Sequence, residues 1–224
     1  MTGGGMNLFL AGFGDVNWVG LLTLIPILLI SMAAHELAHG WVAFKMGDPT
    51  PKRAGRLSFN PIKHMDPLGT AMFFITYIFG GMVFGWAKPI PVSPYYFKNR
   101  QVGMAIVGAA GPITNFILGI ILILVLNWTH PDSNGQVFNI LFLAFQVNIV
   151  LGLFNLIPIP PLDGSRVVGA FMPRRAYEKW VELDRYGMLL VLVLIVLFQS
   201  QFFRLIRWVM WGLAKLFLTE YIIL

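Results

Sequence analysis

The pentapeptide His35-Glu36-Leu37-Ala38-His39 has the residue types and spacing of a helical metal site. In an α-helix, side chains at positions i and i+4 project from the same face, so the two imidazoles can bind one metal ion. The carboxylate of Glu36, beside the first imidazole, is placed to take a proton from a water molecule there. The chain contains no cysteine, so any further ligand must be a histidine, an aspartate or a glutamate.

A catalytic zinc site normally has three protein ligands and one open position, so a third ligand must come from elsewhere in the chain. We expect Asp163, because three prolines end the apolar segment before it and Gly164 follows it directly, which holds the carboxylate in a set position. The alternative is that Asp163 caps a helix beginning at Ser165. His64 and Asp66 are weaker candidates, since their lysine and proline neighbours indicate a surface loop.

Asn115 lies in a later apolar stretch, just after Gly111 and Pro112, and a buried amide must find hydrogen-bond partners. Two roles are open for it. The amide donates to an oxyanion during catalysis, or it makes a hydrogen bond between two helices that small residues allow to pack closely. No specific role is expected for His130, which lies in a predicted outer loop.

The elements that position these residues are predicted to be membrane helices. Of the 224 residues, 57% are hydrophobic and 12% are charged, and the mean hydropathy is +0.74. Soluble domains carry roughly twice that share of charge, so the composition predicts an all-α polytopic membrane protein of one domain, with about five to six membrane segments. The expected segments are a motif helix at 18–44, a segment at 66–100, spans at 101–128, 136–157 and 186–203, and a helix at 204–224.

Lysine and arginine are concentrated on one side of the predicted spans, which marks the cytoplasmic side. Five of them lie between residues 45 and 63 and five between 166 and 185, but none lies in the loop 127–136. We read the net charge of +6 in this way and expect no nucleic-acid partner. The active site then lies nearer the cytoplasmic side.

These orientations agree only if residues 66–100 begin and end on the cytoplasmic side. We therefore expect a re-entrant segment, partly extended because its second half is rich in glycine and proline, beside a wet cavity near the active site. The helix at 204–224 has Arg204, Arg207, Trp211 and Lys215 on one face. It either lies in the membrane interface or crosses the membrane.

Three motifs together resemble the site-2 protease family of intramembrane zinc metalloproteases: HExxH in a membrane helix, GPxxN ending at Asn115, and NxxPxPPLDG beginning at Asn155. They occur in the family's order, and the resemblance covers about residues 18–175. The run 84–92 also looks like the membrane-associated loop of a compact prokaryotic branch.

The resemblance implies that His35, His39 and Asp163 bind one zinc ion and that Glu36 is the general acid/base. It further implies that Asn115 and Asn155 support the substrate or the oxyanion. Single-span membrane proteins would be the substrates, cut within or near their transmembrane helices.

The same resemblance implies a multi-pass protein of a prokaryotic cell membrane, in contact with the lipid bilayer. The loops and the tail have no room for the PDZ or CBS domain of many relatives, so we expect a catalytic core alone. A separate regulatory partner and the oligomeric state are left open. A second hypothesis is an ion or proton transporter that uses His35, Glu36 and His39 as its pathway, and a third is a structural scaffold.

Overall fold

The computed structural model describes residues 18–79, 85–133 and 135–217, and its regular elements in these ranges are helices. The four long helices are α1 (Trp18–Lys45), α4 (Arg100–Thr129), α5 (Gln136–Asn155) and α8 (Gly187–Phe217). The shorter ones are α2 (Thr50–Arg53), α3 (Pro67–Phe79), α6 (Asp163–Gly169), α7 (Arg174–Glu182) and the 3-10 turns η2 (Pro61–His64), η3 (Pro94–Tyr96) and η4 (Leu183–Tyr186). The chain is therefore an all-α membrane protein, as predicted.

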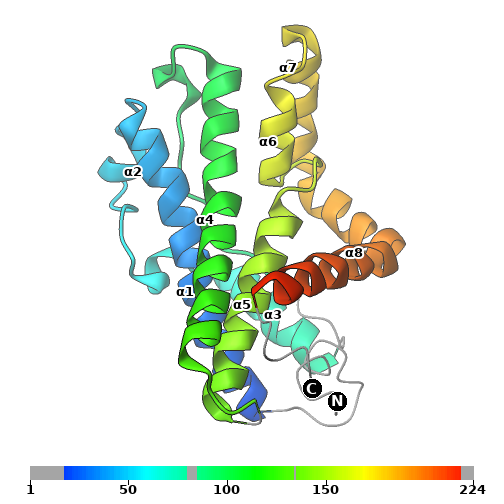
Figure 1. Ribbon diagram of the computed structural model, residues 1–224. Helices are drawn as coiled ribbons and strands as arrows, with labels where there is room; N and C mark the ends of the chain where they lie inside the picture. The colour runs from blue at the N-terminus through cyan, green and yellow to red at the C-terminus, as the bar shows by residue number, and fades with distance from the viewer. Residues whose placement is uncertain (1–17, 80–84, 134, 218–224) are drawn as a thin grey trace.

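Three helices in the described ranges, α1, α4 and α5, are long and apolar enough to cross a membrane. Helix α4 contacts both α1 and α5, and the three run side by side as a bundle (Figure 1). Glycines in α4 permit the close approach, since a side chain at Gly111 would meet α1 and one at Gly119 would meet Ile149 of α5. The larger predicted number of membrane segments remains a prediction.

The two lysine- and arginine-rich regions lie at the same end of the bundle. Helices α2 and α7 are at this end, and the turn between α4 and α5, which has neither residue type, is at the other end (Figure 1). The orientation expected from the loop charges requires both regions to lie at one end, and the side of the membrane that this end faces remains a prediction.

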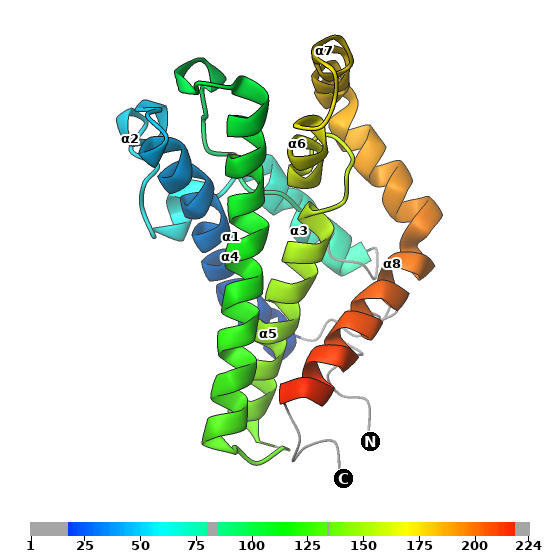
Figure 2. The same cartoon turned by 45° about the horizontal axis from the view of Figure 1, so that its top comes forward.

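Helix α8 joins two segments that the sequence analysis treats separately, the span at 186–203 and the helix at 204–224. It runs without interruption through this boundary because no proline falls in it and its glycines lie only at Gly187 and Gly212. The helix bends along its length (Figure 2). Its second half packs against α4 and α5 through Val209, Met210 and Leu213. Residues 218–224 of the predicted segment lie outside the described residues.

The segment 66–100 begins as helix α3 and returns as an extended chain. The backbone N–H of Lys88 donates to the carbonyl of His64 at 2.8 Å, and Met65 forms an isolated antiparallel bridge with Ala87. The extended part, 85–93, therefore lies beside the start of the segment. A segment that enters and leaves the membrane on the same side requires this arrangement. The glycines Gly80 and Gly81 lie outside the described residues, and passage through the membrane remains a prediction.

Candidate metal centre

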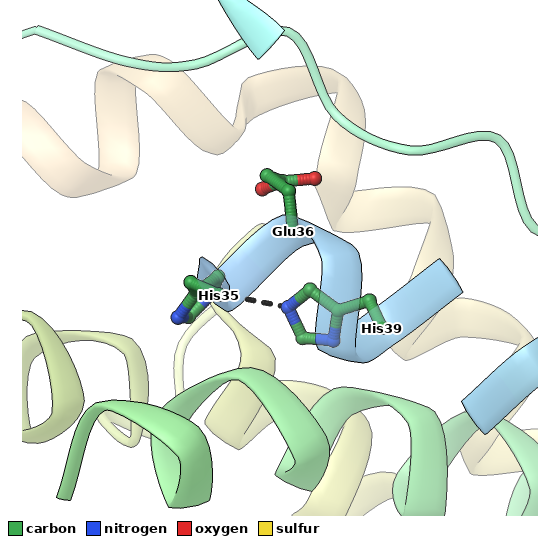
Figure 3. Close-up of side chains that lie close together, drawn as sticks. All are labelled: His35, Glu36 and His39. Atoms are coloured by element: carbon green, nitrogen blue, oxygen red, sulfur yellow. Dashed lines mark hydrogen bonds between the residues drawn. The ribbon is translucent and has the colours of Figure 1, made fainter. Parts of the chain in front are cut away.

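His35 and His39 lie one turn apart on α1, and their imidazoles turn towards each other (Figure 3). The two Nε2 atoms are 3.0 Å apart. Both side chains are buried, as expected for residues in the middle of a helix that packs against α4.

The other ring nitrogen of each histidine faces an acceptor. The Nδ1 of His35 is 2.6 Å from the Oδ1 of Asn115, and the Nδ1 of His39 is 2.6 Å from the carbonyl oxygen of Val107. A backbone carbonyl only accepts hydrogen bonds, so His39 carries its proton on Nδ1. The same holds for His35 when the amide oxygen of Asn115 faces it, which leaves the Nε2 lone pair of each neutral ring for a ligand.

Asp163 brings a third donor atom to the same point. Its Oδ2 lies 3.1 Å from the Nε2 of His35 and 3.3 Å from the Nε2 of His39. Helix α6 begins at Asp163, with Leu162 in the capping position, so Asp163 is not the cap of a helix starting at Ser165. Burial raises the pKa of the Asp163 carboxyl; in the metal-free site, where a proton takes the place of a metal cation between these atoms, the resulting positive charge of the histidines outweighs burial and holds the Asp163 pKa below its usual range.

The three atoms fit a metal ion. With both Nδ1 positions protonated, the two Nε2 atoms and the Oδ2 of Asp163 are three acceptors with no hydrogen between them, and only a proton or a metal cation can hold them together. Bonds of about 2.0–2.1 Å to a tetrahedral zinc ion place neighbouring ligand atoms about 3.3–3.4 Å apart. The three separations here, 3.0, 3.1 and 3.3 Å, are close to that value, and the Oδ2 is buried without a hydrogen-bond partner.

Helix α4 approaches this cluster through Gly111. A Cβ atom at this position would lie 2.5 Å from the Nε2 of His35 and 2.5 Å from the Nε2 of His39. Glycine therefore leaves open the space beside both ligand nitrogens.

Glu36 projects from another face of α1, away from the paired imidazoles (Figure 3). Its Oε2 accepts a hydrogen bond of 2.9 Å from the backbone N–H of Ile90, in the extended segment 85–93. One of its carboxylate oxygens is also within 4.8 Å of ligand atoms of His35 and His39. The carboxylate is thus near the cluster and held by the extended segment.

A cavity of about 940 Å³ lies beside the cluster and is lined by α1, α3, α5, α8 and the extended segment. His35, Glu36, His39 and Asp163 line it, together with Asn155. The amide of Asn155 donates to the carbonyl of Leu151 at 3.0 Å, so one of its two N–H groups is engaged within α5.

The other candidates lie outside the cluster. His64 is buried beside the cavity, with its Nε2 2.8 Å from the carbonyl of Ser58. Asp66 accepts a hydrogen bond from the N–H of Gly69 in the first turn of α3. His130 ends α4 in a left-handed conformation, with φ of 43°.

Asn115 makes the interhelical hydrogen bonds that one of its two proposed roles requires. Besides its contact with His35, its Nδ2 donates to Oδ1 of Asn148 on α5 at 2.9 Å. Support of an oxyanion by Asn115 remains a prediction.

Three groups around the cluster were not among the predicted site residues. Val107 acts through its backbone carbonyl, which no side-chain pattern reveals. Ser31 and Asn148 are buried polar residues in α1 and α5, and a polar side chain within an apolar span was the signal that could have identified them.

These features are those of a metallopeptidase built on an all-α membrane protein, and the model of peptidase family M50 matches residues 23–133 and 130–198. The chain belongs to this family, the site-2 protease family. It is similar to YwhC of Bacillus subtilis strain 168, named as a zinc metalloprotease, with 41% identity over 77% of this chain and 80% of the relative. It is also similar to Rip2 of Mycolicibacterium smegmatis, again named as a zinc metalloprotease, with 29% identity over 86% of this chain and 75% of the relative. No solved structure matches the chain.

Proposed function

We propose that this protein is an intramembrane zinc endopeptidase in which His35, His39 and Asp163 hold one zinc ion per chain. The observation that carries the proposal is the convergence of three acceptor atoms within 3.3 Å of one another, with both Nδ1 protons directed elsewhere. Family M50 membership and the names of the relatives support zinc as the metal. A zinc ion held there polarises a carbonyl and lowers the pKa of water towards about 7.

Glu36 is the general acid/base of the proposed reaction. Its carboxylate lines the cavity next to the two histidines, so it takes a proton from the attacking water and delivers it to the leaving amine. The N–H of Ile90 orients one carboxylate oxygen. Asn155 also lines the cavity, and in this proposal its amide supports the substrate or the oxyanion.

The substrate is a single-span membrane protein whose helix unwinds before cleavage, because the amides of a helix are shielded by their own hydrogen bonds. The cavity walls are largely apolar, with Leu24, Leu28 and Phe73 among them, which suits the side chains of a membrane helix. The extended segment 85–93 is suited to pair with the unwound substrate as a neighbouring strand. We place the site nearer the cytoplasmic side of a prokaryotic cell membrane, by the loop charges.

The first experiment measures zinc per chain by elemental analysis in the detergent-purified wild type, Glu36→Gln and Asp163→Ala. We expect one zinc ion in the first two proteins and a clear loss in the third. Asp132→Ala, in the loop between α4 and α5, is the matched carboxylate control and should retain zinc. Wild type purified without chelators that contains no zinc would contradict the proposal.

The second experiment tests hydrolysis in proteoliposomes with single-span model substrates. Glu36→Gln should lose cleavage by about 10²–10⁴-fold while keeping its zinc, because only proton transfer is removed. A protein that transports ions would instead show altered ion or proton flux in this variant. Cleavage that persists in Glu36→Gln would remove Glu36 from the proposed role.

A further inference from the structure

A chain of buried polar side chains lies behind His35 and connects three helices. Asn115 of α4 faces the Nδ1 of His35 with its Oδ1 and donates through its Nδ2 to the Oδ1 of Asn148 on α5, at 2.9 Å. The Nδ2 of Asn148 donates to the Oγ of Ser31 on α1 and to the carbonyl of Ala144, each at 2.9 Å. We call Ser31, Asn148 and Asn115 the amide relay.

A backbone carbonyl fixes the orientation of the two asparagine amides in the relay. The oxygen of Ala144 can only accept, so the NH2 group of Asn148 must face it and the Oδ1 of Asn148 must face Asn115. The NH2 group of Asn115 then faces Asn148, and its Oδ1 faces His35. This arrangement requires a proton on the Nδ1 of His35 and leaves its Nε2 lone pair directed at Asp163.

The surroundings prevent water from reversing this orientation. Asn115 is 0% exposed, Asn148 2% and Ser31 3%, so each amide must satisfy its groups within the protein. His39 needs no such relay, because the carbonyl of Val107 contacts its Nδ1 directly. The two histidines are therefore oriented by different means, one by the backbone and the other by side chains.

We propose that Asn148 is a positioning residue for the metal centre, which fixes the Nδ1-protonated form of His35 through Asn115. This inference rests on the proposed zinc site. Without the acceptor on Asn148, the NH2 group of Asn115 keeps only a long contact of 3.4 Å to the backbone carbonyl of Ser31. The amide can then turn over and present its NH2 group to His35. The imidazole proton then moves to Nε2, where it competes with the metal ion.

The test is the zinc affinity of Asn148→Leu, a substitution of nearly the same shape, measured by competition with a fluorescent chelator on detergent-purified protein. We expect the dissociation constant to rise by about 10-fold, the lower end of the range for losing a hydrogen-bond partner of a metal ligand, because Asn148 acts on His35 through Asn115. The matched control is Ile149→Val, a buried apolar change at the next position of α5, which should leave zinc affinity unchanged. The visible spectrum of the Co²⁺-substituted protein should change in Asn148→Leu and not in Ile149→Val.

A rescue variant separates positioning from general loss of structure. Asn115→Asp places a carboxylate against the Nδ1 of His35, which accepts the proton whichever way it turns. Adding Asn148→Leu to Asn115→Asp should therefore cost less than threefold in zinc affinity. If Asn148→Leu does not fold, Asn148→Ala replaces it in both arms.

Two outcomes would overturn the inference. Zinc affinity of Asn148→Leu within threefold of wild type would show that the relay does not act on His35. An equal loss in the Asn115→Asp background would show that Asn148 acts only through general structure. Wild type that binds no zinc would instead overturn the proposed function itself.

Discussion

Replacement of Gly111 by alanine tests the geometry of the metal centre with a single methyl group. The added Cβ would lie 2.5 Å from each of the two Nε2 atoms, whereas ordinary van der Waals contact begins at 3.4 Å. Each imidazole would therefore have to retreat by about 0.9 Å, well beyond the tolerance of about 0.2 Å on a metal–ligand distance. Neither ring can retreat without disturbing the hydrogen bond at its Nδ1, to Asn115 or to Val107.

We expect Gly111→Ala to weaken zinc binding by at least about 100-fold, or about 2.8 kcal/mol. The stability of the metal-free protein should change much less. Alanine is better than glycine in a helix interior by about 1 kcal/mol, and overpacking costs about 1–3 kcal/mol in the opposite direction. The net loss of stability is therefore about 2 kcal/mol or less.

The assay combines zinc content by elemental analysis, zinc affinity by chelator competition, and thermal melting with and without a chelator. Gly119→Ala is the matched control, since it makes the same change in the same helix, and its Cβ would meet the Cδ1 of Ile149, a flexible side-chain end, at 2.8 Å. This variant should bind zinc as wild type does. Wild-type zinc affinity in Gly111→Ala would refute the placement of α4 against the two histidines.

Three further predictions concern the extended segment and the metal. Asp48 is fully buried, and its two carboxylate oxygens accept from the N–H of Ser93 at 2.7 Å and the N–H of Thr50 at 2.9 Å. Asp48→Asn turns an NH2 group towards one of these donors and should cost about 1–3 kcal/mol in the free energy of unfolding, measured by thermal or denaturant melting in detergent. A Cβ at Gly69 would collide with the backbone of Trp86 in the extended segment. Gly69→Ala should therefore reduce cleavage of a model substrate by about tenfold or more while zinc content stays at the wild-type level. Gly212→Ala, with open space around it, is the control. Removal of zinc by a chelator should abolish cleavage, and re-addition of zinc should restore it. Zinc at 100 times its dissociation constant should also stabilise the fold by about 2.7 kcal/mol, measured as a rise in melting temperature.

The parts of the site that follow from helical spacing were predictable from the sequence. His35 and His39 share a face because four residues make about one turn, whatever the tertiary structure. Asp163 was predictable because prolines and a glycine frame it, and because it follows a span that ends on the same side as the motif helix ends. The all-α class followed from composition alone.

Other features depend on contacts between distant segments, which local patterns do not encode. The approach of Gly111 to both imidazoles depends on how α4 crosses α1, and Asn148 meets Asn115 only because α4 and α5 pack together. The continuity of α8 was missed because the charges at Arg204 and Arg207 suggested a change of environment. An α-helix tolerates such residues without a break, so a change in polarity did not mark an end.

The arrangement divides the site between two faces of α1. The histidine face rests on α4, where Asn115 and Val107 hold the rings, and these partners are buried within packed helices. The face of Glu36 meets the extended segment, where the backbone N–H of Ile90 donates to the Glu36 carboxylate. Changes in α4 should therefore appear first as altered zinc binding, and changes in the extended segment should appear as altered turnover with zinc retained. The contrast between Gly111→Ala and Gly69→Ala measures this separation directly, because the first adds a methyl group against the two histidines of α1 and the second adds one against the extended segment at Trp86.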